Sequence, residues 1–390
     1  MRRVFFWVGL LCVVVSTTFA QTPVSKAKQA ALEGKVRTYY VAADEVEWDY
    51  APGGVDHMTG QLFDKYANIF IERGPHRIGS KYRKAIYREY TDATFGKLKP
   101  RAPEWEHMGL MGPLLRAEVG DTMKVVFKNN ASKPYTMHPH GVFYLKNSEG
   151  APYADGTSGA DKSDDDVPPG GTHTYVWNVP ERAGPAPGDP SSLVWLYHSH
   201  RNEPKDVNSG LVGGIVVTAR GKARPDGSPK DVDREFVTLF MVFDENQTWY
   251  LDYNIQMYTT DPKGVNKAEF FPVDLDGASN PFVGGGFGAV NHKYSINGYL
   301  FGNMPMMTMK KGERVRWYLL SLGDGFNFHS PHWHGNVVLQ DHKRTDVVTL
   351  MPAQMVTVDM VPDNPGIWMF HCHVSDHLEG GMHAHYRVLP

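Results

Sequence analysis

Cysteine is almost absent from this sequence, and its scarcity excludes a fold held together by disulfide bonds. The 390 residues contain two cysteines, Cys12 and Cys372. Cys12 lies in an apolar N-terminal run with the features of a secretory signal, so we expect a single cysteine in the mature chain. One cysteine cannot form an internal disulfide, and a free thiol in an oxidising compartment is readily oxidised unless something binds it. A metal ion would bind it.

Long hydrophobic runs are also scarce. Residues 4–15 are almost all apolar, follow Arg2 and Arg3, and precede the small and polar residues 16–20. This order predicts a signal peptide over residues 1–20. A membrane anchor is the alternative, but the run is shorter than the roughly 20 residues of a spanning helix. Since no later segment is long and apolar enough to span a bilayer, we expect a periplasmic or secreted protein.

Charge of one sign is not in excess. The net charge is −3 at pH 7 and no basic stripe is present, so we expect no nucleic-acid partner. Aromatic residues make up 12% of the chain, which favours strands. Short alternating apolar runs, separated by Gly, Pro, Asn and Asp, predict an all-β sandwich or barrel. The clearest runs are residues 122–128, 173–179, 213–218, 314–320 and 355–360.

An internal repeat divides the sequence. Residues 120–127 resemble residues 312–319, and each segment is followed by a His-x-His pair and later by a second pair. Two copies of one β-domain are the simplest interpretation. We place these domains at residues 36–220 and 235–390. Residues 221–234 are rich in Lys, Arg, Pro, Gly, Ser and Asp, and we interpret them as an exposed linker.

The strongest chemical motif begins at His371. Cys372 is followed five positions later by His377 and ten positions later by Met382. A thiolate, two imidazoles and a weak axial thioether make the trigonal site that is typical of blue-copper electron-transfer centres. We predict that His329 is the second imidazole.

Histidine also occurs in four His-x-His pairs, two in each predicted domain. Residues i and i+2 of an extended strand point to the same face, so each pair can bind one metal ion or bridge two. A single pair is weak evidence, but four pairs supply eight imidazoles, which suits three clustered coppers. The pairs are His138 and His140, His198 and His200, His332 and His334, and His371 and His373.

With these motifs the chain resembles the multicopper oxidases, and within them the two-domain members and the ceruloplasmin and hephaestin type. The resemblance implies two cupredoxin-like domains, which are Greek-key β-sandwiches. It also implies one-electron oxidation of a phenol, Fe²⁺ or Cu⁺ at a type 1 copper, coupled to four-electron reduction of O₂ to water at a trinuclear cluster. Further matching segments are residues 74–79, 87–92, 197–200, 204–206, 244–246, 296–299 and 365–368.

The resemblance assigns each ligand to one of four coppers. His329, Cys372 and His377 bind the type 1 copper, with Met382 axial. One type 2 and two type 3 coppers form the cluster. Its ligands are His138 and His332 for the type 2 copper, His140, His198 and His373 for one type 3 copper, and His200, His334 and His371 for the other.

The ligands are divided between the two predicted domains. Residues 36–220 supply four cluster histidines and no cysteine, whereas residues 235–390 supply the other four and the type 1 site. The cluster therefore requires one domain of each kind. The resemblance implies that two-domain chains close a ring, so we predict a homotrimer with clusters at its subunit interfaces. A monomer that pairs its own two domains is the alternative.

Asp376 lies directly before the ligand His377. By the resemblance an acid at this position helps to place Fe²⁺ beside the type 1 copper, and a structural loop acid is the alternative. Residues 289–293, where the ceruloplasmin type has a second acid, contain none. This difference counts against an efficient iron site.

Two other groups have a functional and an ordinary interpretation. Methionines that alternate on an expected strand bind Cu⁺ or fill a core; they are Met304, Met306, Met307 and Met309. An acidic loop resembles a Ca²⁺-binding stretch or is a solvated turn; its residues are Asp161, Asp164, Asp165 and Asp166. The remaining histidines match no copper motif, and we interpret them as structural or surface residues.

Two competing functions remain. A copper nitrite reductase is also a two-domain trimer, but it has its blue copper in the first domain, where this chain has no cysteine. A non-enzymatic copper-binding cupredoxin protein would tolerate loss of cluster ligands, and none is lost here.

Overall fold

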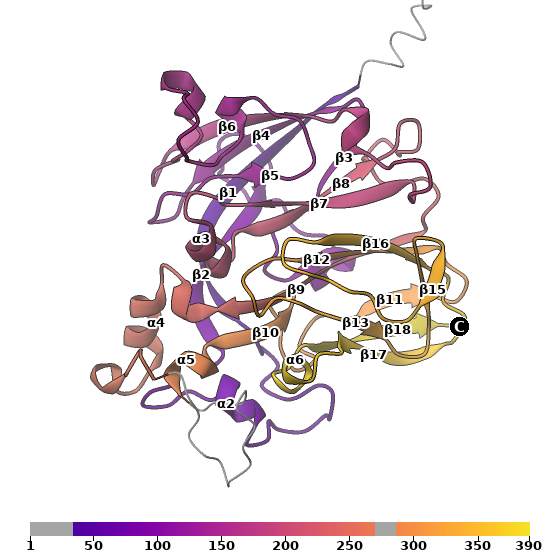
Figure 1. The fold of residues 1–390 in the computed structure, drawn as a ribbon. Coiled ribbons are helices and arrows are strands. Elements are labelled where there is room, and N and C mark those ends of the chain that lie inside the picture. The colour runs from indigo at the N-terminus through magenta and orange to yellow at the C-terminus, as the bar shows by residue number, and fades with distance from the viewer. Residues whose placement is uncertain (1–33, 270–285) are drawn as a thin grey trace, which may run out of the picture. The chain divides into compact units, whose positions relative to one another are not determined.

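The strands of the described residues form four mixed sheets (Figure 1). The computed structural model describes residues 34–269 and 286–390. The predicted signal peptide lies outside these residues. Strands are much more frequent than helices, so the all-β fold class is confirmed.

Residues 36–218 form two sheets of four strands each. Their strand orders are β2-β1-β4-β6 and β3-β8-β7-β5. The strands are β1 Val36–Asp49, β2 Lys81–Tyr90, β3 Leu115–Glu118, β4 Thr122–Asn129, β5 His138–Pro139, β6 Thr172–Asn178, β7 Ser192–His198 and β8 Val212–Thr218.

Residues 234–389 form the other two sheets, with strand orders β10-β9-β12-β16-β14-β15 and β11-β18-β17-β13. The strands are β9 Arg234–Asp244, β10 His292–Ile296, β11 Met307–Lys310, β12 Val315–Ser321, β13 Pro331–Trp333, β14 Val338–Gln340, β15 Lys343–Thr345, β16 Met355–Met360, β17 Gly366–Cys372 and β18 His383–Leu389. The helices are short: α2 Ala67–Ile71, α3 Glu203–Ser209, α4 Leu251–Tyr258, α5 Phe287–Val290 and α6 Ser375–Glu379.

The second pair of sheets repeats the topology of the first. The order β2-β1-β4-β6 recurs as β10-β9-β12-β16, and β3-β8-β7-β5 recurs as β11-β18-β17-β13. Even the parallel pairs correspond, because β1 lies parallel to β4 as β9 does to β12. This recurrence is what the sequence repeat predicts. The additional strands β14 and β15 have no counterpart in the first half.

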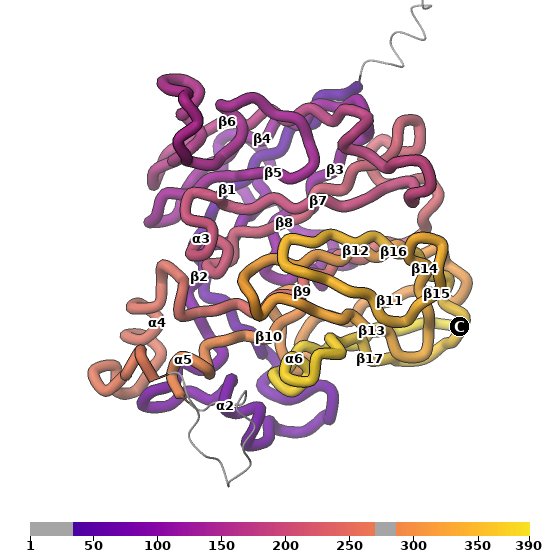
Figure 2. The backbone as a smooth tube through the Cα atoms, viewed as in Figure 1, coloured from indigo at the N-terminus to yellow at the C-terminus, as the bar shows by residue number. Residues whose placement is uncertain are grey.

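Three apolar cores hold these sheets. One lies within residues 36–250 and one within residues 236–388. The third contains residues of both halves, among them Leu196 from β7 and Leu239 from β9. Figures 1 and 2 show β7 beside β12 and β16, where the Ser192 and Tyr318 hydroxyls lie 2.7 Å apart. The two halves therefore share a core as well as a connecting segment.

The connecting segment is partly exposed and partly buried. Five of residues 221–234 are buried, including Ala223 and Val232. The backbone of Arg224 donates a hydrogen bond of 2.7 Å to Ser228, which closes a turn that packs under Thr218. Seven of these residues are exposed, while the buried ones spaced among them anchor the segment, and its role as a linker stays a prediction. Among the described residues, no helix has the length and apolar character needed to cross a membrane.

Candidate metal centre

Cys372 ends strand β17 inside the core of the second half. Its side chain is fully buried, and its Sγ lies 3.6 Å from Nδ1 of His377 and 3.9 Å from Nδ1 of His329. The two Nδ1 atoms are 3.1 Å apart. One thiol and two imidazoles thus converge on one point, as the motif predicts.

Helix α6 returns the chain to this point. Met382 follows it, is fully buried in the same core as Cys372, and donates its backbone N–H to the His377 carbonyl at 2.9 Å. The Cys372 N–H donates to the Met382 carbonyl at 3.1 Å. These bonds hold the strand, the helix and the methionine in one closed loop.

Burial decides the protonation of these groups. Desolvation raises the pKa of the Cys372 thiol to about 11 and lowers the pKa of His377 to about 4. His329 is also shifted far below its ordinary pKa by burial. The imidazoles are therefore neutral near pH 7, which is the form that binds metal ions, whereas the thiol must lose its proton when a metal ion binds.

The N-terminal histidine set consists of His138, His140, His198 and His200. Strand β5 pairs with β7 so that His138 lies opposite His198. The Nε2 atoms of His140 and His198 are 3.1 Å apart. The ring of His138 lies 5.1 Å from that of His200.

The C-terminal histidine set consists of His332, His334, His371 and His373 and repeats this arrangement. Strand β13 pairs with β17 so that His332 lies opposite His371. The Nε2 atoms of His334 and His371 are 3.1 Å apart. The rings of His332 and His373 are 5.5 Å apart.

Backbone carbonyls orient one ring in each pair. Nδ1 of His138 donates to the Glu149 carbonyl at 2.7 Å, and Nδ1 of His332 donates to the Asp346 carbonyl at 2.9 Å. Since a carbonyl oxygen can only accept, Nδ1 carries the proton and Nε2 keeps its lone pair. His371 is held in the same way by the Cys372 carbonyl at 2.7 Å.

The two histidine sets do not meet within one chain. The N-terminal set borders a cavity of about 390 Å³, and the C-terminal set borders another of about 460 Å³. Among the ring contacts and hydrogen bonds of the described residues, none joins a histidine of one set to a histidine of the other. Each set therefore offers one closely spaced Nε2 pair and two further imidazoles.

Comparison with known proteins decides the family. Two family models described as multicopper oxidase match residues 107–222 and 278–390. The chain belongs to the multicopper oxidase family. The matched segments contain every predicted ligand of this multicopper oxidase, which confirms the family resemblance seen in its motifs.

The similar curated proteins are much longer than this multicopper oxidase. It is 48% identical over 355 residues to the ferroxidase HEPHL1 of Homo sapiens, and the match covers 90% of this chain and 29% of that protein. It is 42% identical to hephaestin of Mus musculus, with coverages of 91% and 30%. It is 39% identical to ceruloplasmin of Homo sapiens, with coverages of 90% and 31%. The chain therefore spans about a third of these relatives.

Solved structures support the cupredoxin-like fold. The blue copper oxidase from Nitrosomonas europaea matches with a TM-score of 0.54 and 19% identity, covering 91% of this chain and 86% of that one. The multicopper oxidase mgLAC matches with a TM-score of 0.55, 19% identity and the same coverages. At this identity the likeness concerns the fold alone.

The weaker sequence signals have different outcomes. Three of the four methionines are buried in the core of the second half, and only Met306 is partly exposed, at 38%. Packing therefore accounts for Met304, Met307 and Met309 without copper. Asp376 is partly buried. Burial and the negative charge of Asp376 raise the pKa of Tyr294, whose ring lies 5.4 Å from that of His377. Its position beside the type 1 set agrees with the motif, and its role stays a prediction.

Lysine side chains form ion pairs with the acidic loop. Lys162 contacts Asp165 at 3.1 Å and Asp155 at 3.0 Å, and Lys146 contacts Asp155 at 3.0 Å. Asp164 is buried and accepts the Gly150 N–H at 2.6 Å. These ammonium groups balance the charge that a Ca²⁺ ion would balance, so the ordinary interpretation is favoured.

Several supporting residues belong to no predicted ligand set. The Ser330 N–H donates to the Cys372 Sγ at 3.3 Å, and Asn327 Oδ1 lies 3.4 Å from Nε2 of His329. In the first half, the Ser199 hydroxyl donates to Asp206 at 2.7 Å and accepts the Thr136 N–H at 3.0 Å. Only the position of Ser199 between two predicted ligands could have drawn attention to it.

Proposed function

We propose that this chain is a multicopper oxidase in activity, which couples one-electron oxidation of a small reductant to reduction of O₂ to water. The observation that carries the proposal is the strand β17. It ends with His371 and Cys372, and His373 follows directly, so one stretch of backbone connects a thiol-containing site to histidines of the C-terminal set. Relatives named as ferroxidases support the same chemistry.

Copper fits both kinds of site, since a buried thiol with two imidazoles suits a blue copper and clustered imidazoles suit an oxygen-binding group. Bound copper would accept single electrons and deliver them together to O₂. The chain positions the donor atoms: Ser330 directs an N–H at Sγ, and carbonyls fix the tautomers of His138, His332 and His371. The core around Cys372 excludes water from the thiol.

The substitution Cys372→Ser tests this function. A hydroxyl is a poor copper ligand, so the variant should bind one copper fewer per chain and lose the intense visible band and the oxidase activity. The magnetic resonance signal of the type 2 copper should remain. Ser375→Ala in the neighbouring exposed position is the matched control and should keep both colour and activity. Full oxygen uptake by Cys372→Ser would refute the proposal.

The electron donor is proposed at the level of class, as Fe²⁺, Cu⁺ or a phenol. Asp376 beside His377 and the names of the relatives favour Fe²⁺. A second observation favours aromatic donors, because the exposed ring of Phe328 lies 6.0 Å from the His377 ring and Phe326 is exposed nearby. Within residues 289–293, which contain no acid, Lys293 is buried and donates to three backbone carbonyls.

Oxygen uptake with each donor class distinguishes these alternatives. If Fe²⁺ is the donor, Asp376→Asn should lower kcat/KM for Fe²⁺ about tenfold or more, the cost of removing one charged group that contacts a desolvated ion. The same variant should leave uptake with a phenol within about twofold. Equal losses with both donors would show that Asp376 supports the loop and does not place iron.

We further propose that the active form is a homotrimer. Its support is that each chain carries two histidine sets on separate cavities, and that each set alone lacks half of the ligands. Apposition of the N-terminal set of one subunit and the C-terminal set of the next would complete the cluster.

We also propose that the protein is exported, because residues 1–20 have the features of a secretory signal. Determining the N-terminal sequence of the secreted protein would test this.

Subunit complementation tests the trimer. One chain carries His138→Ala and His140→Ala, and a second carries His332→Ala and His334→Ala. Each is expected to be inactive alone. Mixed trimers contain interfaces between the intact N-terminal set of the second chain and the intact C-terminal set of the first, so activity should return on co-refolding. If monomers pair their own domains, the mixture stays inactive and the trimer proposal fails.

A further inference from the structure

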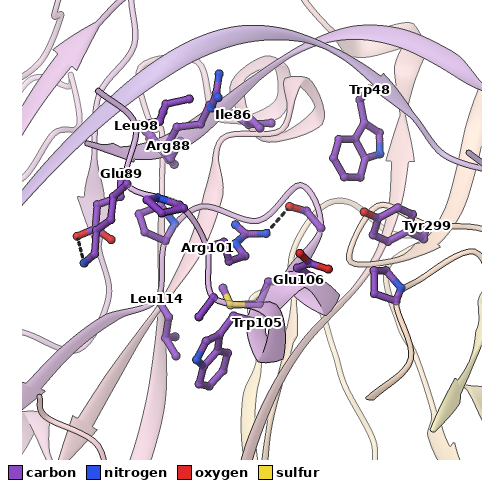
Figure 3. A pocket seen from close by; sticks show the side chains of 18 of the residues that line it. Trp48, Ile86, Arg88, Glu89, Leu98, Arg101, Trp105, Glu106, Leu114 and Tyr299 are labelled. Atoms are coloured by element: carbon purple, nitrogen blue, oxygen red, sulfur yellow. Dashed lines mark hydrogen bonds and ion pairs between the residues drawn. The ribbon is translucent and has the colours of Figure 1, made fainter. Parts of the chain in front are cut away.

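A third cavity lies away from both histidine sets, between the two halves of the chain. It has a volume of about 660 Å³, within the range of small-molecule sites. Figure 3 shows Arg101 in the middle of this cavity, with Trp105, Glu106 and Tyr299 around it and Trp48 on the far wall. No copper-ligand residue lines it.

The charges around the cavity are paired with two exceptions. Glu89 contacts Lys99 at 2.9 Å, and Arg116 contacts Glu235 at 2.9 Å. Arg88 contacts Asp44 at 3.6 Å. Among the ion pairs of the described residues, none includes Arg101 or Glu106.

Arg101 is held as a rigid donor group. Its Nη1 donates to the Gly109 carbonyl at 2.7 Å, and its Nη2 donates to the Met111 carbonyl at 2.6 Å. A guanidinium has five N–H groups, so three remain for a ligand. The cavity walls desolvate the group and lower its pKa, although a guanidinium stays charged at neutral pH. Glu106 is the acid that acts on this guanidinium, but the two form no ion pair, so the remaining N–H groups can bind an anion.

Aromatic rings form the adjoining walls. The Trp48 indole N–H donates to the Gly298 carbonyl at 2.7 Å, which fixes the ring, and the rings of Trp48 and Tyr299 are 5.1 Å apart. Trp105 lies on the other side of Arg101 in Figure 3. Aromatic side chains beside a fixed guanidinium suit a planar ring that carries a carboxylate.

We propose that this cavity binds a small aromatic monocarboxylate, with its carboxylate on Arg101 and its ring against Trp48 and Tyr299. Glu106 limits the ligand to one negative charge, because its carboxylate lies near Arg101 and repels a second anionic group. This site is independent of the proposed oxidase activity, since it shares no residue with the predicted ligands.

Calorimetric titration of the copper-loaded protein with benzoate tests the proposal, because benzoate is not oxidised by a blue copper. We expect one site per chain in the sub-millimolar range. Cyclohexanecarboxylate and benzyl alcohol, which lack the flat ring or the charge, should bind much more weakly. No heat with benzoate at millimolar concentration would overturn the proposal.

Two variants of opposite effect locate the site. Arg101→Gln should weaken benzoate binding about 10- to 100-fold, the contribution of charge-assisted hydrogen bonds. Glu106→Gln removes a neighbouring negative charge on an exposed side chain and should tighten binding about two- to fivefold. Arg314→Gln, an exposed change elsewhere, should have no effect.

Binding to copper is the main competing outcome. Benzoate bound to copper would still bind to Arg101→Gln, would change the copper spectrum and would compete with azide. This result would refute the cavity site. If Arg101→Gln fails to fold, the affinity of Glu106→Gln for benzoate still tests the proposal. Tighter binding supports it, and unchanged affinity contradicts it.

Discussion

At the scale of single residues, His107 joins the two halves through a ring whose two nitrogens both form hydrogen bonds. Nδ1 donates to the Glu104 carbonyl at 2.9 Å, and Nε2 accepts the Val237 N–H of strand β9 at 3.2 Å. The ring is buried, and desolvation lowers its pKa from 6.5 to about 4. Protonation would remove the acceptor for Val237, so the folded protein requires the neutral ring.

The sign of the pH effect follows. Between about pH 6.5 and 4 the unfolded chain binds a proton at His107 and the folded chain does not, so stability falls as the pH falls through this window. The shift corresponds to about 3 kcal/mol at most. Denaturant unfolding at pH 7 and pH 4.5 measures it. His107→Gln can keep an acceptor without titrating, so it should lose less stability between the two pH values than the natural chain. Parallel losses would contradict this account.

The sequence could identify the residues that converge but not how their rings are held. His-x-His spacing and the position of Cys372 follow from strand alternation, which is a local property. The carbonyls of Glu149 and Asp346, which set the tautomers of His138 and His332, come from loops of irregular conformation. No residue pattern reports such backbone contacts. His107 likewise matches no motif, since its partner Val237 is 130 positions away.

At the scale of elements, strand β2 is joined to the second half by a buried ion pair. Lys84 and Glu245 are both fully buried and in contact, and the Tyr50 hydroxyl donates to the same carboxylate at 2.5 Å. Burial raises the pKa of Glu245, and the charge of the nearby Lys293 partly offsets this increase. One carboxylate thus lies within reach of two buried lysine side chains.

We expect Glu245→Gln to lower the free energy of unfolding by about 3–5 kcal/mol, because the buried Lys84 loses its counter-charge. Glu47→Gln is the matched control. Glu47 forms an exposed pair with Arg83 at 3.0 Å, so its loss should cost under about 1 kcal/mol. Denaturant titration compares the two, and similar losses would show that Glu245 is not a buried counter-ion. Lys84→Met combined with Glu245→Leu should recover part of the loss.

The elements themselves were mostly accessible from the sequence. The five alternating runs correspond to β4, β6, β8, β12 and β16 within a residue or so at each end. Strands β5 and β13 have only two and three residues, too few for a period to show. The Lys84–Glu245 contact spans 161 positions, and pairing over such a distance leaves no trace in local pattern.

At the scale of the whole molecule, the shared core couples the two repeats. Leu239 is fully buried in the core that contains Leu196 and Leu320. We expect one cooperative unfolding transition, although the sequence divides into two repeats. Scanning calorimetry should show a single peak, and Leu239→Ala should lower stability by about 2–5 kcal/mol without splitting it. Two separate peaks would mean that the repeats unfold independently. The division at residues 221–234 stays a prediction of sequence organisation.

Strand β17 has a consequence for the way two reactants are kept apart. Because successive side chains alternate, Cys372 faces the inner layer with Met382, while His371 and His373 face the opposite side. Under the proposed function, the reductant and dioxygen would approach opposite faces of this strand. Only electrons would pass between the two faces, along the covalent bonds of the backbone and side chains. Evolution could then remodel the donor surface near Phe328 freely, with little disturbance to the oxygen side.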